Sequence, residues 1–211
     1  GYSIASRIIQ NGSDMRAPFL TGNVDAQTLR GEGDGRINIL LIGIGGAGHP
    51  GGQLADTIMV ASIDPVNKTL ALLSLPRDLY VEIPGNGWAK INHAHAFGQE
   101  KNGAGPELLK RTVSRILDLP IHYFIRLDFS GFTKIVDTLG GVTVTLDQPI
   151  NDPLYPDKKL EGYDPFYLAA GTHLLNGEIA LKVARSRQTS SDFARAGRQQ
   201  VLLTALRDKA F

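Results

Sequence analysis

The stretch INILLIGI at residues 37–44 decides the fold class, because a short apolar run of this kind is typical of a central strand. Two more strands are expected at residues 57–63 and 70–75. The turn-forming residues 64–68 lie between them and predict an antiparallel hairpin. A sheet is therefore expected to start near residue 37.

Strands and helices are interleaved over the rest of the chain. Strands are expected at residues 123–127 and 142–146, and helices at residues 106–117, 129–139, 176–184 and 192–207, with Asn176 as an N-cap. Residues 151–165 are rich in Pro, Asp and Lys and are expected to form an exposed excursion. This order predicts an α/β domain with a central mixed sheet flanked by helices.

Composition limits what kind of protein this is. The 211 residues suit a single domain with a sizeable core, and the absence of cysteine excludes disulfides, thiolate catalysis and cysteine-ligated metals. A net charge of +1 gives no general attraction to nucleic acid, so no nucleic-acid partner is expected. Residues 1–36, rich in Gly, Asn and Asp toward their end, are expected to be a linker or membrane-proximal segment, and residues 37–211 the domain. Because Gly1 is not a natural start, we expect a piece of a longer protein.

The sequence GIGGAG at residues 43–48 satisfies the dinucleotide-binding pattern G-x-G-x-x-G directly after the expected strand. That pattern requires a helix to follow at once, with its N-terminus facing the pyrophosphate. Here HPGG follows at residues 49–52, and proline beside paired glycines does not sustain a helix. We therefore expect a loop at a strand end that borders a site.

Two clusters of basic residues could bind phosphate. Arg77 and Asp78 follow an apolar strand, where they form either a surface ion pair or a guanidinium fork aimed at phosphate oxygens. In the last helix, Asp192, Arg195, Arg198 and Gln199 share one stripe at i, i+3 and i+4 spacing, just after Arg185 and Arg187. That stripe is either a solvated basic face or the wall of an anion site.

Metal ligands are sparse in the sequence. Asp56 precedes the second strand and could bind a divalent cation, although a single carboxylate is a weak signal. The pair His93 and His95 has no further well-spaced ligands and is expected to be structural or part of a polar loop rather than a zinc site. Lys90 and Asn92, in the same stretch, could face a polar cleft.

Taken together, these stretches resemble the LytR–CpsA–Psr family of bacterial cell-wall phosphotransferases. The matching pieces are NILLIG (38–43), ADTIMV (55–60), SLPRD (74–78), KIN (90–92), FSGFTKIVDTLGGVTV (129–144) and residues 171–200. The resemblance covers about residue 37 to the end. It implies an extracytoplasmic domain, tethered by an N-terminal transmembrane helix, whose sheet and helices enclose a hydrophobic cavity for a polyprenyl tail.

The resemblance also implies an activity and residue roles. The enzyme would move a glycopolymer with its phosphate from a polyprenyl-pyrophosphate carrier to a peptidoglycan hydroxyl, with Mg²⁺ or Mn²⁺ as cofactor. Asp56 would hold the metal, and Asp192, or else Asp78, would act as the acid/base. The pyrophosphate would be held by Arg77, Arg185, Arg187, Arg195, Arg198, Gln199 and Lys90.

This chain departs from the family pattern at the loop after the first strand. Gly45 and Gly46 stand where the family commonly has an aspartate that ligates metal, and His49 could replace that ligand. Two alternatives therefore stay open beside the transferase. The same site could hydrolyse the lipid pyrophosphate, or the chain could be a non-catalytic module that binds lipid carriers or glycan.

Overall fold

The computed structural model describes residues 35–157, 160–186 and 192–210, and the chain divides into two compact units. One comprises residues 16–130, and the other residues 131–211 together with residues 1–15. The expected linker at residues 1–36 lies almost entirely outside the described residues, so its boundary stays a prediction.

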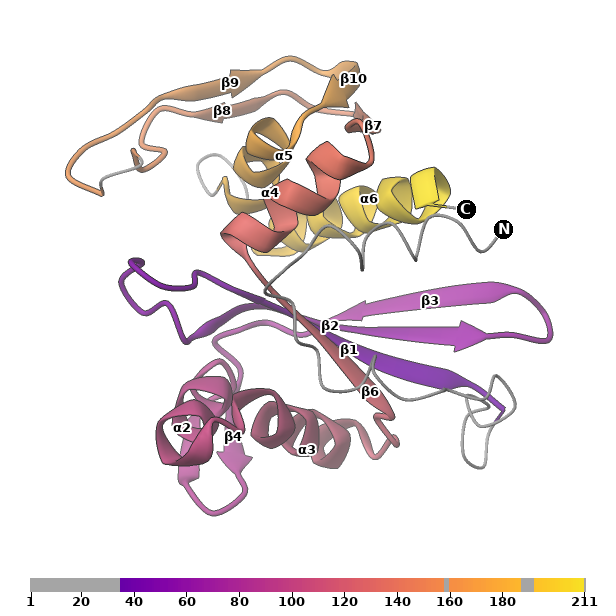
Figure 1. The fold of residues 1–211 in the computed structure, drawn as a ribbon, viewed down its shortest axis with the longest axis vertical. Helices are drawn as coiled ribbons and strands as arrows, with labels where there is room; N and C mark the ends of the chain where they lie inside the picture. The colour runs from indigo at the N-terminus through magenta and orange to yellow at the C-terminus, as the bar shows by residue number, and fades with distance from the viewer. Residues whose placement is uncertain (1–34, 158–159, 187–191, 211) are drawn as a thin grey trace. The chain divides into compact units, whose positions relative to one another are not determined.

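The unit of residues 16–130 is built on a four-stranded sheet in the order β3-β2-β1-β6 (Figure 1). Its strands are β1 (Ile37–Ile44), β2 (Ala55–Asp64), β3 (Thr69–Ser74) and β6 (Tyr123–Asp128). β2 pairs antiparallel with β1 and β3, whereas β6 pairs parallel with β1. The predicted mixed sheet is therefore confirmed.

The predicted hairpin between β2 and β3 is also confirmed, and its turn has a local cause. The Asp64 carboxylate accepts hydrogen bonds from the backbone N–H groups of Val66 (3.0 Å) and Asn67 (2.9 Å). Lys68 then adopts a left-handed conformation with φ of 53°. An aspartate that bonds the backbone two and three residues on is the usual way to start such a turn.

Two helices cover one side of this sheet, α2 (His93–Asn102) and α3 (Gly105–Leu117) (Figure 1). Along β1 every second residue is buried, including Leu40, Ile42 and Ile44, and these pack with Leu109 and Val113 of α3. Pro106 lies in the first turn of α3, where a missing N–H does no harm. The helix predicted at residues 106–117 is confirmed.

A short hairpin of β4 (Tyr80–Ile83) and β5 (Gly87–Lys90) packs with this unit and was not predicted. Val81 and Ile83 are buried in the core, while Tyr80 and Glu82 are exposed. Strands of four residues give too brief an alternation to be recognised with confidence from a sequence pattern. The tight turn requires positive φ at Gly85 and Gly87, 73° and 76°.

The other unit contains three helices and four short strands among its described residues (Figure 1). They are α4 (Phe129–Thr138, which begins at the end of the first unit), β7 (Val142–Leu146), β8 (Ile150–Asp152), β9 (Phe166–Leu168), β10 (Gly171–Leu175), α5 (Gly177–Arg185) and α6 (Asp192–Ala210). β7 pairs with β10 and β8 with β9, both antiparallel. Asn176 caps α5 as predicted, because its Oδ1 accepts a hydrogen bond of 2.9 Å from the N–H of Ile179.

The exposed excursion expected at residues 151–165 is wrong in part. Asp152 and Tyr155 are only 3% and 5% exposed, because Asp152 ends a strand of the β8–β9 hairpin and Tyr155 packs against Phe166. Proline and charge predict a loop but do not tell whether it folds back onto a core. Within the described ranges, no helix is both long and apolar enough to cross a membrane.

Candidate functional site

Arg77 lies at the centre of a charged cluster at one end of the four-stranded sheet. Its Nη1 donates to Oδ1 of Asp56, at the start of β2. Its Nε lies 3.6 Å from Oδ2 of Asp78, whose other oxygen is 2.8 Å from Nζ of Lys90. The sequence assigned all four residues to the site, and the structure brings them together. We call these four residues the Arg77 cluster.

Backbone hydrogen bonds hold the Arg77 cluster in place. The N–H of Asn92 donates to the carbonyl of Arg77, and the N–H of Ala55 donates to the carbonyl of Asn92, both at 3.2 Å. Asn92 is 4% exposed. The KIN motif therefore ties the segment of Arg77 to the start of the strand that carries Asp56.

The glycine loop leads from β1 directly into the antiparallel β2 without an intervening helix, so the dinucleotide site is excluded as expected. The N–H of Gly46 donates to the carbonyl of Gly52 at 3.0 Å, and a Cβ on Gly52 would lie only 2.0 Å from the carbonyl oxygen of Gly46. The loop is thus folded tightly onto itself.

Asp128 lies beside this loop and was not predicted as a site residue. It ends β6, which is parallel to β1, and a Cβ on Gly46 would lie 2.9 Å from its Cβ. Ligands of α/β proteins bind beyond the carboxyl ends of parallel strands. An aspartate that ends an apolar strand was the signal that could have identified it.

The metal assignment to Asp56 and His49 is not settled by geometry. Nδ1 of His49 donates to the carbonyl of Pro50 at 2.9 Å, and its ring meets that of Phe129 edge-on, with centroids 5.2 Å apart. Nowhere in residues 35–157, 160–186 and 192–210 do three His, Asp or Glu side chains gather closely enough to hold a metal ion. The metal therefore stays a prediction.

In the other unit, Arg198 and Gln199 of α6 bind the end of α5. Arg198 donates to the carbonyls of Val183 (3.1 Å) and Ser186 (2.6 Å), and Gln199 donates to that of Ala184 (3.3 Å). The last carbonyls of a helix have no partner within it and carry a partial negative charge. Arg198 and Gln199 therefore have a capping role, whatever else they bind.

Arg185, like Lys182 on the same helix, lies over the ring of Tyr155. Its guanidinium lies 5.5 Å from the ring centroid of Tyr155 and donates to the hydroxyl at 3.3 Å. Burial raises the pKa of Tyr155 above its ordinary value. Next to Arg185, the Ser186 hydroxyl donates to the buried Asp152 carboxylate at 2.8 Å.

Of the remaining residues of the predicted site, the structure describes the side chains of Arg195 and Arg198 but not those of Arg187 and Asp192. Arg195 is 9% exposed, and burial, followed by the nearby charge of Arg195, lowers the pKa of Arg198. Arg187 lies outside the described residues, as does the side chain of Asp192. Their proposed roles stay predictions.

Comparison with known proteins places the chain in a family. A model of the LytR_cpsA_psr family matches residues 2–211. The polyisoprenyl-teichoic acid–peptidoglycan teichoic acid transferase TagT of Bacillus subtilis (strain 168) is 35% identical over 182 residues, 84% of this chain and 54% of that protein. The regulatory protein MsrR of Staphylococcus aureus (strain COL) is 38% identical over 176 residues, 82% of this chain and 49% of that protein. The chain thus spans about half the length of these relatives.

Solved structures give the same result. The structure of YwtF (TagT) with bound octaprenyl pyrophosphate lipid is similar with a TM-score of 0.63 and 34% identity, over 83% of this chain and 65% of that chain. TagT bound to LI-WTA has a TM-score of 0.65 and 34% identity, over 83% and 64%. The matched motifs and the mixed α/β architecture agree with these similarities. The chain belongs to the LytR–CpsA–Psr family.

Proposed function

We propose that this chain transfers a glycopolymer, together with its phosphate, from a polyprenyl-pyrophosphate carrier to a hydroxyl group of peptidoglycan. One observation supports it most. The Arg77 cluster lies at the end of the sheet in a chain that is similar to TagT over 83% of its length. TagT is named as a teichoic acid transferase and has been solved with octaprenyl pyrophosphate. A hydrophobic cavity for the polyprenyl tail is part of this proposal.

The chemistry requires cations that neutralise phosphate oxygens. In the proposed reaction the acceptor hydroxyl attacks the sugar-side phosphorus, a new P–O bond forms, and the bond to the polyprenyl phosphate breaks. Positioning and electrostatic stabilisation are the main sources of rate in such loose transition states. Arg77 would bind the oxygens that gain charge, because the paired carboxylates hold its guanidinium in one orientation.

The leaving proton needs an acceptor. Asp192 is the first candidate, by motif match, and Asp78 the second. Asp78 is 44% exposed and lies between Arg77 and Lys90, so its carboxylate can be reached by a hydroxyl of the acceptor. Arg185, Arg187, Arg195, Arg198, Gln199 and Lys90 remain the proposed further ligands of the pyrophosphate.

A divalent cation fits this site only if substrate phosphates share its coordination with the protein. One oxygen of Asp56 is bonded to Arg77, and the side chain is 28% exposed, which leaves the second oxygen for an ion. Mg²⁺ is often held by one or two carboxylates with substrate phosphates and water. Mg²⁺ or Mn²⁺ would supply additional positive charge to the phosphates, and His49 is the proposed second protein ligand.

The location follows from the substrates. A chain that acts on lipid-linked glycopolymer and peptidoglycan would work at the extracytoplasmic face of the bacterial membrane, and we propose that an N-terminal helix outside this sequence anchors it there. This proposal rests on the family likeness.

The test is to incubate the protein with a short-chain polyprenyl-pyrophosphate saccharide, Mg²⁺ and peptidoglycan oligomers, and to identify the products by mass spectrometry. Saccharide phosphate on the glycan with free polyprenyl phosphate supports the transferase. Free saccharide phosphate alone identifies a hydrolase instead. Lipid binding with no product in the presence of either Mg²⁺ or Mn²⁺ identifies a binding module, and a parallel reaction with EDTA measures the metal requirement.

A further inference from the structure

The chain's single tryptophan, Trp88, lies on the exposed face of the β4–β5 hairpin beside Tyr80. The two rings are stacked, with centroids 5.8 Å apart and planes inclined by 28°. Both side chains nevertheless remain largely open to solvent, at 63% for Trp88 and 64% for Tyr80. The pair is thus an apolar surface that the described part of the chain leaves uncovered.

The strand register directs this pair outward. Val81 and Ile83 are buried, so the residues that alternate with them must face solvent. Tyr80 pairs with Lys90 across the hairpin, and Glu82 pairs with Trp88. Tyr80 and Trp88 are therefore diagonal neighbours on one face, a separation that aromatic side chains can span.

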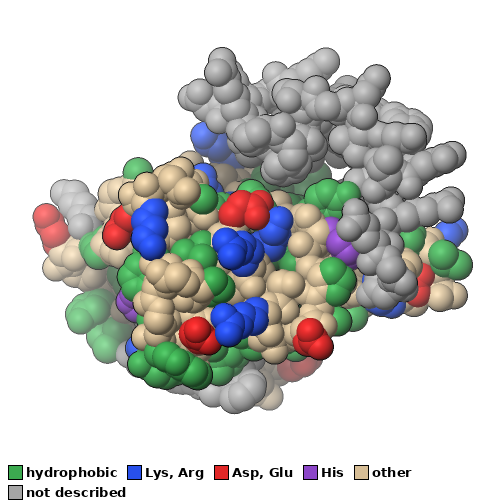
Figure 2. Space-filling view, turned by 90° about the horizontal axis from the view of Figure 1, so that it is seen from below, with side chains coloured by type: hydrophobic (Ala, Val, Ile, Leu, Met, Phe, Trp, Pro, Cys, Tyr) green, Lys and Arg blue, Asp and Glu red, His purple; other side chains and the backbone are tan. Residues whose placement is uncertain are grey.

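Opposite charges border the aromatic pair at both ends. At one end Nζ of Lys90 lies 2.8 Å from Oδ1 of Asp78, and at the other Nη2 of Arg115 lies 2.9 Å from Oε2 of Glu82. We call the aromatic pair together with these two ion pairs the strip. Each ion pair has one cation and one anion, so the strip has no net charge. The side of the molecule that carries α2 and α3 shows basic and acidic side chains interspersed in the same way (Figure 2).

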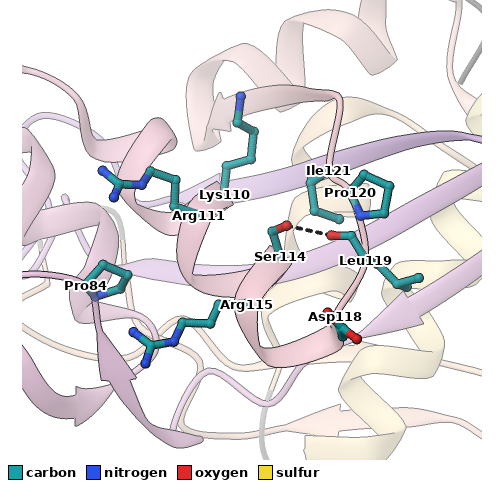
Figure 3. A pocket seen from close by; sticks show the side chains of 9 residues that line it. All are labelled: Pro84, Lys110, Arg111, Ser114, Arg115, Asp118, Leu119, Pro120 and Ile121. Atoms are coloured by element: carbon teal, nitrogen blue, oxygen red, sulfur yellow. Dashed lines mark hydrogen bonds between the residues drawn. The ribbon is translucent and has the colours of Figure 1, made fainter. Parts of the chain in front are cut away.

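The strip continues into a polar depression. Arg115 and Pro84 line a cavity of about 580 Å³ on α3, together with Lys110, Arg111, Ser114, Asp118, Leu119, Pro120 and Ile121 (Figure 3). Two of these lining residues are tied together, because the Ser114 hydroxyl donates to the carbonyl of Leu119 at 2.6 Å (Figure 3). The other end of the strip shares Asp78 and Lys90 with the Arg77 cluster. A chain-like ligand could therefore extend from the Arg77 cluster across the aromatic pair to this cavity.

We propose that Tyr80 and Trp88 form a stacking platform for a sugar ring of the acceptor glycan, an inference that rests on the proposed transfer to peptidoglycan. The C–H groups on the face of a sugar ring carry slight positive charge and lie favourably on the negative face of an aromatic ring. The bordering carboxylates accept hydrogen bonds from sugar hydroxyls, while Lys90 and Arg115 donate to sugar oxygens. Because the aromatic pair with its two bordering ion pairs is neutral overall, this part of the surface suits a hydroxyl-rich glycan better than an anionic lipid surface, which attracts clusters of excess cations.

The platform also has a simpler structural role, which the test must separate from binding. Aromatic pairs across a hairpin stabilise it by themselves. A purely structural pair would lower the melting temperature when it is truncated and would leave glycan affinity unchanged. Affinity and melting temperature are therefore measured on the same variants, and Tyr80→Phe, which retains the ring, is included.

Because Trp88 is the only tryptophan of the chain, its fluorescence reports on the platform directly. We would titrate the protein with soluble peptidoglycan glycan strands and follow its emission. Tyr80→Ala keeps the reporter and should weaken binding about tenfold, the equivalent of one lost aromatic contact. Tyr167→Ala is the matched control, since Tyr167 on β9 is 66% exposed, and it should bind like the unmodified protein.

Two results would overturn the platform. One is equal glycan affinity for the unmodified protein and Tyr80→Ala. The other is an emission shift with vesicles that contain phosphatidylglycerol but none with saturating glycan, which would identify a membrane contact.

Transfer kinetics separate this inference from the proposed function. Tyr80→Ala should raise the KM for the glycan acceptor more than it lowers kcat. If the protein binds glycan through Trp88 but forms no product, the proposed function fails and the platform stands. If the protein transfers normally and Tyr80→Ala changes neither KM nor affinity, the platform fails and the proposed function stands.

Discussion

Arg77 is the residue on which the proposed chemistry depends most, because two aspartates orient its guanidinium. Arg77→Ala should lower kcat for transfer at least about 100-fold, the usual effect of removing one group that stabilises transition-state charge. Stability should change by only about 1 kcal/mol, since the ion pairs of Arg77 are partly exposed. Steady-state kinetics with urea unfolding of the same samples measures both quantities.

Arg36 provides the matched control for Arg77. It also pairs with an aspartate, Asp64, at 3.5 Å, but next to the opposite end of β1. Arg36→Ala should therefore leave kcat unchanged. Normal turnover in Arg77→Ala, or an equal loss in both variants, would show that Arg77 has no special role.

Arg198 differs from Arg77, because its donors already bind backbone carbonyls of Val183 and Ser186. Arg198→Ala should lower the free energy of unfolding by about 1–2 kcal/mol, since the end of α5 loses a buried cationic cap. Arg207→Ala in the last turn of α6 should have little effect, because among the described residues Arg207 pairs only with the adjacent, exposed Asp208. Denaturant unfolding compares the two variants.

A different result for Arg198→Ala would reassign the residue. If stability stays the same while transfer is lost, its main role is to bind substrate rather than to cap α5.

At the scale of elements, the contact between α4 and α5 depends on a glycine. A Cβ at Gly177, the first residue of α5, would lie 2.3 Å from the carbonyl oxygen of Thr133 in α4. Gly177→Ala should therefore destabilise the protein by about 1–3 kcal/mol, although alanine is the better helix former. Thermal unfolding provides the measurement.

Gly197 in α6 offers the control with the opposite sign. A Cβ there meets none of the described residues within 4 Å, so Gly197→Ala should stabilise the protein by up to about 1 kcal/mol through helix propensity alone. If both variants shift the melting temperature in the same direction, close packing of α5 on α4 is not the reason that residue 177 is glycine.

At the scale of the whole molecule, His95 makes stability depend on pH. Its side chain is fully buried in α2, where Nδ1 donates to the carbonyl of Gln53 at 2.7 Å and Nε2 has no hydrogen-bond partner within the described part of the chain. Burial lowers the pKa of His95. The unfolded chain binds a proton near pH 6.5 and the folded chain only at lower pH, so stability should fall as pH falls below about 6.5 toward the folded pKa.

His95→Asn tests this dependence. The asparagine amide can replace the Nδ1 donor but does not titrate, so its stability should decline less steeply between neutral and acidic pH. Unfolding midpoints measured across that range provide the comparison. Equal slopes in the two proteins would assign the acid sensitivity to other groups.

Most of the sheet was predictable because its signals are local. The apolar run of β1 and the turn at Asp64 each lie within about ten residues, and so do the helical spacing of α3 and the cap of α5 at Asn176. The rejection of a dinucleotide site was equally local, since His49 and Pro50 prevent a helix after the glycine loop. The sequence therefore predicted the strands of the four-stranded sheet, β7, the helices α3 to α6 and the family motifs in their correct order, whereas it missed α2 and the short strands β4, β5, β8, β9 and β10.

The sequence predicted which residues belong to the candidate site, but it did not predict which groups they contact. Sequence motifs placed Arg77, Lys90 and Arg198 in one group of phosphate ligands, yet Arg198 donates to helix carbonyls and Lys90 to an aspartate. Spacing along a helix identifies a shared face but not what that face contacts.

By itself, the sequence determined the longer strands and helices in their order, the mixed α/β class and the family motifs, because turn chemistry and periodicity act between near neighbours. Only the tertiary structure decided which carboxylates orient Arg77, that Asp152 is buried, and that Tyr80 and Trp88 face solvent as a stacked pair. Asp56 lies 21 residues before Arg77 in the chain, and Asp152 is covered by a partner strand. The outward direction of Tyr80 and Trp88 depends on Val81 and Ile83 being buried in the core. For that reason no local pattern could specify them.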